Sequence, residues 1–199
     1  MNTFSSVQLK EANDAVAAGM AFVLPLWFVP IPVVGSAACN AAEAIMVKNV
    51  LKALRPAAGE KEGDALFWFF RKKYLLVNVA TFVPYAGPAV QLLEAFGLGR
   101  FVMVCCERGI SLDDEVAMGA AFNSIEPALW DPEGVIQFYE NATGETFPPK
   151  VRGPFTTAVN GIRAVVETTN AIPGMRAGQE LLGEGLRKTI SWVKSPFKK

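Results

Sequence analysis

Residues 15–42 read AVAAGMAFVLPLWFVPIPVVGSAACNAA and contain no charged side chain. This stretch is longer than the roughly 20 apolar residues that a helix needs to cross a bilayer. Three prolines interrupt it near the middle, and each one lacks an N–H group and disfavours helix at the residue before it. The stretch therefore predicts two helices joined by a turn, the first ending near Leu24 and the second covering about Val33–Leu54.

Each apolar arm of this pair has about ten residues, or roughly 15 Å of helix, which is half of the hydrocarbon thickness of a membrane. That length is typical of a re-entrant hairpin whose turn lies in lipid. The side chains that we expect at its tip are Pro25, Trp27, Phe28, Pro30 and Pro32.

A second uncharged stretch covers residues 74–93 and is also interrupted near its centre, by Pro84, Gly87 and Pro88. It predicts a second hairpin over residues 74–106, after a first one over residues 15–54. No sustained alternation of apolar and polar residues appears, so strands should be few. We therefore predict an all-α fold made of proline-broken helical hairpins and an amphipathic C-terminal helix.

Basic residues flank the apolar regions where lipid headgroups would lie. Arg71, Lys72 and Lys73 follow an aromatic run, and such junctions are typical of the membrane interface. Residues 178–199 form a predicted basic amphipathic helix carrying Arg187, Lys188 and Lys194. This helix fits anionic lipid and equally fits docking on the acidic residues 107–149, which hold nine acidic side chains and one arginine.

The composition excludes several classes of function. The chain has 199 residues, 51% of them hydrophobic, and its net charge of zero argues against nucleic-acid binding. Because histidine is absent, Ser-His and Cys-His nucleophiles and histidine metal sites are excluded. The acidic run 113–115 is interpreted as a helix start with Ser111 as its N-cap. We predict no catalytic residue, no metal site and no cofactor, and hence no enzyme.

Three cysteines are too few for a disulfide framework and fit a reducing, cytoplasm-facing location. Cys105 and Cys106 end an apolar run, where reversible palmitoylation is chemically plausible, although small core residues are the plainer interpretation. Gly97 and Gly99 are interpreted as helix-packing residues. Glu43 follows the first apolar stretch and needs a hydrogen-bonding partner or water, because a carboxylate alone in hydrocarbon is costly.

The order of breaks and glycines also suggests a family. Pro30, Ile31 and Pro32 lead through an alanine-rich helix towards Gly59, and residues 82–87 lead to residues 96–100 in the same way. Over residues 15–108 the chain resembles a helical-hairpin domain of unknown function, found in bacterial inner-membrane proteins and beside some GTPase domains. The resemblance implies membrane association and an accessory role without catalytic residues. The chain departs from that family by lacking a GTPase domain and by adding an acidic middle and a basic tail.

The sequence thus predicts an apolar hairpin region, residues 1–108, followed by an acidic and basic helical region, residues 109–199. The expected function is that of a membrane-associated structural or adaptor protein. Its partners would be membrane lipid and either another protein or a second copy of the chain. Two alternatives stay open: a soluble helical carrier of a lipid or other hydrophobic ligand, and an accessory subunit of a larger membrane complex.

Overall fold

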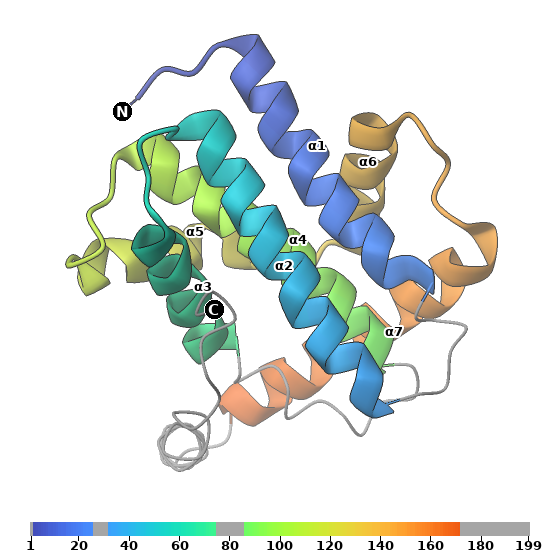
Figure 1. Cartoon of the computed structure of the whole chain (residues 1–199). Helices are drawn as coiled ribbons and strands as arrows, with labels where there is room; N and C mark the ends of the chain where they lie inside the picture. Colours follow the sequence, from blue (N-terminus) through green and yellow to red (C-terminus); the bar gives the residue numbers. More distant parts are fainter. Residues whose placement is uncertain (1, 26–31, 75–85, 172–199) are drawn as a thin grey trace.

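The computed structural model describes residues 2–25, 32–74 and 86–171 (Figure 1). Within these ranges the chain forms seven helices and no strand, which confirms the all-α prediction. The helices are α1 (Ser6–Val23), α2 (Pro32–Leu54), α3 (Glu60–Tyr74), α4 (Ala86–Arg108), α5 (Glu115–Leu129), α6 (Pro132–Thr143) and α7 (Pro149–Ala171).

The first two helices have nearly the predicted bounds. α1 ends at Val23, one residue before the expected end, and α2 begins at Pro32, one residue early. They run in opposite directions and pack along each other (Figure 1). Pro25 is exposed just after α1. The turn itself lies outside the described residues, so the hairpin stays a prediction.

Part of the break predicted for the second hairpin lies inside a helix. α4 begins at Ala86, so Gly87 and Pro88 lie inside its first turn rather than in a break. A proline is tolerated there because the first N–H groups of a helix have no intrahelical acceptor. Pro84 and the rest of residues 75–85 lie outside the described residues.

Local capping explains several helix starts. At α1, Ser5 Oγ accepts a hydrogen bond from the amide of Gln8, whose side chain accepts one from the amide of Ser5, which makes a capping box. The N-cap of α5 is Asp114, which accepts from the amide of Ala117 at 2.8 Å, so the assignment of Ser111 was wrong. The helix starts three residues later because a carboxylate caps it directly.

Helix α4 is the centre of the bundle and contacts α1, α2, α3, α5 and α7. Close approach depends on glycine, as predicted for Gly97 and Gly99. A Cβ atom on Gly99 would overlap the side chain of Val16 in α1, and one on Gly97 would lie 2.6 Å from Leu129 Cδ2 in α5. Glycine at these positions therefore lets α1 and α5 pack directly on the backbone of α4.

The described helices on either side of residue 108 share one core. Helices α5, α6 and α7 pack on α4 or α1, and one hydrophobic cluster extends from Ala12 to Ile162. Part of the acidic region also pairs with the basic region that follows it. Arg152 on α7 lies 2.6 Å from Glu133 and 3.7 Å from Glu140, both on α6.

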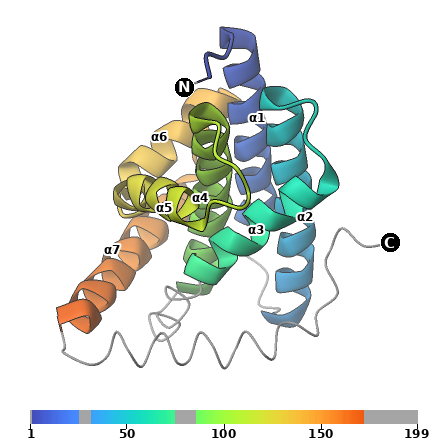
Figure 2. The ribbon, with the colours of Figure 1, turned by 90° about the vertical axis from the view of Figure 1, so that its left-hand side faces the viewer.

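Four helix ends gather at one end of the bundle, which we call the apolar pole. Both views place the start of α2, the end of α3, the start of α4 and the end of α7 there (Figures 1 and 2). The chain leaves the described structure after Pro25 and Tyr74 and returns at Pro32 and Ala86. The two intervening sequences, residues 26–31 and 75–85, contain no charged residue.

Candidate functional site

Three helices of the bundle bring two buried carboxylates to one arginine. Arg71 Nη2 on α3 lies 2.7 Å from Glu43 Oε2 on α2 and 3.0 Å from Glu94 Oε1 on α4. Glu43 is 1% exposed and Glu94 is 7% exposed, and they are the two buried charged residues of the described chain. We call Glu43, Arg71 and Glu94 the buried charge cluster.

The helical repeat explains why Arg71 points inward. Phe67, Phe70 and Tyr74 are buried at a spacing of three and four residues, which marks the inner face of α3. Arg71 follows Phe67 by four residues, and its guanidinium carbon lies 5.0 Å from the centre of the Phe67 ring. The prediction that Arg71 faces headgroups was therefore wrong, whereas Lys72 and Lys73 are exposed.

Among the described residues, the buried charge cluster has two acidic groups and one basic group. Glu43 Oε1 and Arg71 Nε are both buried without a hydrogen-bond partner. Burial, followed by the charge of Glu94, raises the pKa of Glu43 to about 8, against the opposing effect of Arg71. Burial also raises the pKa of Glu94, and Arg71 opposes that shift. One cation thus stabilises two carboxylates incompletely.

Two further ionisable side chains border the cluster and both favour their neutral forms. Burial, with the charges of Glu43 and Glu94, raises the pKa of Cys39 to about 11. Tyr74 is buried, its hydroxyl donates to the carbonyl of Val90 at 3.3 Å, and burial raises its pKa well above the usual value. A thiol and a phenol can ionise only to anions, so neither group supplies positive charge, and in their neutral forms they add no negative charge.

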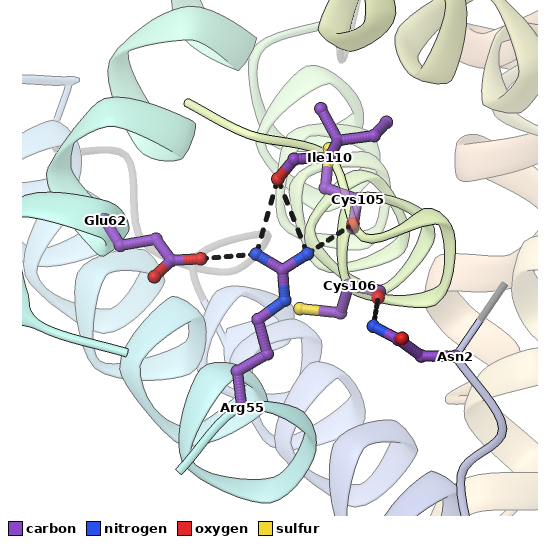
Figure 3. Close-up of polar contacts among 6 residues, drawn as sticks. All are labelled: Asn2, Arg55, Glu62, Cys105, Cys106 and Ile110. Carbon is purple, nitrogen blue, oxygen red and sulfur yellow. Dashed lines mark hydrogen bonds and ion pairs between the residues drawn. The ribbon is translucent and has the colours of Figure 1, made fainter. Parts of the chain in front are cut away.

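A second arginine lies at the C-terminal end of α4 and contacts different partners (Figure 3). Arg55 Nη2 donates to the carbonyl of Cys105 at 3.0 Å, and both terminal nitrogens lie 3.4 Å from the carbonyl of Ile110. Its Nη1 also lies 2.6 Å from Glu62. Asn2 adds bonds to the carbonyls of Cys106 and Glu107 at 3.1 and 2.8 Å. We call this arrangement the α4 clamp, because it adds donors from two distant segments to the carbonyls at and just after the end of α4.

The thiols of Cys105 and Cys106 lie in the core beside the α4 clamp, with 1% and 0% exposure. Burial is the main reason that the pKa of Cys105 rises to about 12 and that of Cys106 to about 11. A lipid-transfer reaction needs an accessible thiolate. This arrangement contradicts the lipidation prediction and fits the plainer interpretation of both residues as core side chains.

The remaining predicted site residues are not brought together by the described structure. Trp27, Phe28, Pro30, Pro84, Arg187, Lys188 and Lys194 all lie outside the described residues. Within the described ranges, no group of three or more Cys, Asp or Glu side chains could hold a metal ion. A recess of about 170 Å³ between α2 and the start of α3 is smaller than the roughly 300 Å³ of small ligand sites.

The sequence predicts that Glu43 needs a partner, but neither Arg71 as that partner nor Glu94 was predicted. The sequence does mark both carboxylates by their isolation from other charges. Between Asp14 and Lys48 the one charged residue is Glu43, and between Lys73 and Glu107 the charged residues are Glu94 and Arg100. Isolated carboxylates in apolar helices are candidates for a buried pair. No family model, no curated protein and no solved structure matches this chain, so a functional assignment rests on these two sites and on the apolar pole.

Proposed function

We propose that the protein attaches to a membrane surface through the apolar pole and acts there as a structural or adaptor component. The observation that carries this proposal is that the start of α2, the end of α3 and the start of α4 lie at one end of the bundle. Residues 26–31 and 75–85, which adjoin these helix ends in the sequence, carry no charge. The segments contain Trp27, Phe28 and Phe82, side chains that gain free energy on leaving water, at about 25 cal/mol per Å² of apolar surface.

Exposed lysines support the same orientation. Lys72 and Lys73 end α3 at the apolar pole and are open to solvent. Each lysine near an anionic bilayer contributes about 1 kcal/mol of binding free energy. Together they would strengthen attachment to anionic vesicles by roughly 30-fold, an effect that salt should weaken.

In this proposal the described helices do not contact lipid. One described helix, Gly87–Arg108, is long and apolar enough to cross a membrane, with a mean hydropathy of 1.5, but 89% of its apolar window is buried inside the bundle. A buried core helix passes the same test of length and composition. We therefore assign the lipid contact to the two uncharged segments and keep the bundle in water.

Vesicle flotation tests this assignment. The wild-type chain should float with vesicles that contain anionic lipid, and the double variant Trp27→Ser, Phe28→Ser should lose most of that binding. Val7→Ser is the matched control, because Val7 is 63% exposed at the opposite end of α1. It should bind like the wild type.

Two results would overturn the proposal: a wild-type chain that stays with the soluble fraction, or a double variant that floats like the wild type. If the chain stays soluble and also forms a defined oligomer that the double variant abolishes, the pole is a protein interface. That outcome would favour the alternative of a subunit in a larger complex.

A further inference from the structure

The buried charge cluster carries an inference that does not depend on membrane attachment. Two carboxylates face one guanidinium, and all three groups come from helices packed against one another. Within the described residues Arg71 is the one cation in contact with either carboxylate. With both glutamates ionised, the cluster would hold one uncompensated negative charge in the core.

The neighbouring helices do not supply the missing charge. α2 itself contributes Cys39, α3 contributes Arg71 and Tyr74, and α4 contributes Glu94. Helix α1 also packs on α2, but Lys10 and Asp14 of α1 pair with each other at the surface, with 75% and 41% of their side chains exposed. A metal ion is not favoured, since the described residues form no group of ligands for one.

We propose that the Glu43–Arg71–Glu94 cluster is a proton-binding site, in which one proton resides on Glu43 while Arg71 and Glu94 form the ion pair. Glu43 Oε2 already accepts a hydrogen bond from Arg71, so the proton belongs on Oε1, the buried oxygen without a partner. A neutral carboxyl is far cheaper to bury than a carboxylate that lacks a full counter-charge. The upward shift in the pKa of Glu43 agrees with this assignment.

Release of the proton would weaken the contact of α3 with α2 and α4. The folded pKa of Glu43 lies above its ordinary value of 4.5, so between pH 4.5 and about 8 the folded state binds more protons than the unfolded state. Stability is fully present below that window and falls as the pH rises through it. The raised pKa of Glu94 acts in the same direction.

Thermal unfolding from pH 5 to pH 9 tests the proposal with Glu43→Gln, because glutamine resembles the protonated side chain in shape and charge. The wild-type melting temperature should fall by roughly 5 to 10 °C across this range. Glu43→Gln should remove most of that fall and should be the more stable protein at pH 9. Glu62→Gln is the matched control, since Glu62 also pairs with an arginine but is 20% exposed in its side chain. It should retain the wild-type pH dependence.

Two more variants separate a proton site from a general role in packing. Glu94→Gln removes the like charge beside Glu43, so the pH at which stability falls should move downward. The double variant Glu43→Gln, Glu94→Gln leaves Arg71 buried without a carboxylate and should lose stability at every pH. One carboxylate is therefore required, and the second is in excess.

Infrared difference spectroscopy of the wild type provides a direct readout of the protonated carboxyl, independent of any stability measurement. The stretch of a buried protonated carboxyl should be present at pH 6, disappear at pH 10, and be missing from Glu43→Gln. The proposal is overturned if no such band is present in the wild type. It is also overturned if Glu43→Gln keeps the full pH dependence of stability, or is less stable than the wild type at pH 9.

Discussion

Arg71, which contacts Glu94 inside α4, and Arg55, at the end of the same helix, have nearly the same exposure but very different partners. The side chain of Arg71 is 20% exposed and that of Arg55 is 21% exposed. Arg55 meets neutral carbonyls and one partly exposed carboxylate, so the charges of the α4 clamp balance. Arg71 meets two carboxylates in the core, so the charges of its cluster do not balance.

This difference shows that the partners of a buried cation, rather than its own exposure, decide whether a site is purely structural. A satisfied helix end contributes stability and changes little with conditions. A core cluster with one negative charge in excess is stabilised by binding a proton. Its stability then depends on the proton concentration, that is, on pH. The α4 clamp is therefore the natural reference against which the buried charge cluster can be measured.

Loss of the cation should have the largest effect in the buried charge cluster. Arg71→Met leaves two buried carboxylates without a counter-charge, and we expect a loss of about 3–5 kcal/mol in the free energy of unfolding at pH 8. The loss should be smaller at pH 5, because both carboxyl groups can then take up protons. Denaturant unfolding at the two pH values measures this. An equal loss at both would remove the contrast with the α4 clamp.

The same change at the α4 clamp should cost less and should not vary with pH. Arg55→Met removes hydrogen bonds to the carbonyls of Cys105 and Ile110, and we expect a loss of about 2 kcal/mol. Unfolding in denaturant at pH 5 and pH 8 should give the same loss within error. A loss that differs between the two pH values would contradict this contrast between the two arginines.

Neutralising the acid of the α4 clamp should have a still smaller effect. Glu62→Gln keeps a hydrogen-bond acceptor near Arg55, and an ion pair at this exposure contributes less than about 1 kcal/mol. The change in unfolding free energy should shrink further in 1 M salt. A large loss that salt does not alter would show that the α4 clamp also depends on a buried charge.

The thiols beside the α4 clamp should show no reaction in the folded state. Cys105 and Cys106 are buried and their pKa values are raised to about 12 and 11, so little thiolate exists at pH 8. A thiol reagent followed by mass analysis should label them at the rate of unfolding. Arg55→Met should speed their labelling, and Arg71→Met should do so only as far as it destabilises the whole bundle. Rapid labelling of the wild type would contradict the packing at this end.

Much of the fold was predictable because proline and charge patterns act locally. The bounds of α2 were found to within one residue, since Pro32 can begin a helix but not continue one. The buried partner of Glu43 was missed for a different reason. Because Arg71, Lys72 and Lys73 are consecutive, they were predicted to lie on one surface. Successive side chains of a helix point about 100° apart, however, and Arg71 lies on the inner face with Phe67.

The position of Glu94 could not be obtained from local pattern alone. It lies in an apolar helix that also reads as a membrane span, and only the packing of α3 on α4 shows which cation it meets. The start of α5 was displaced for a smaller reason, because both Ser111 and Asp114 are good N-caps and the chain selects the second. The spacing of residues in the sequence does not show which distant side chains pair, nor which of two suitable N-cap residues begins a helix.

The bonds from Asn2 to Cys106 and Glu107 impose an order on folding during synthesis. Asn2 cannot make these bonds until more than a hundred further residues have been added, which takes a ribosome roughly 5 to 20 seconds. For that interval α1 has only its nearest successors to pack against. Slow translation would lengthen the time for which the inner face of α1 is incompletely covered. A chaperone that binds this face would protect the chain most during that interval.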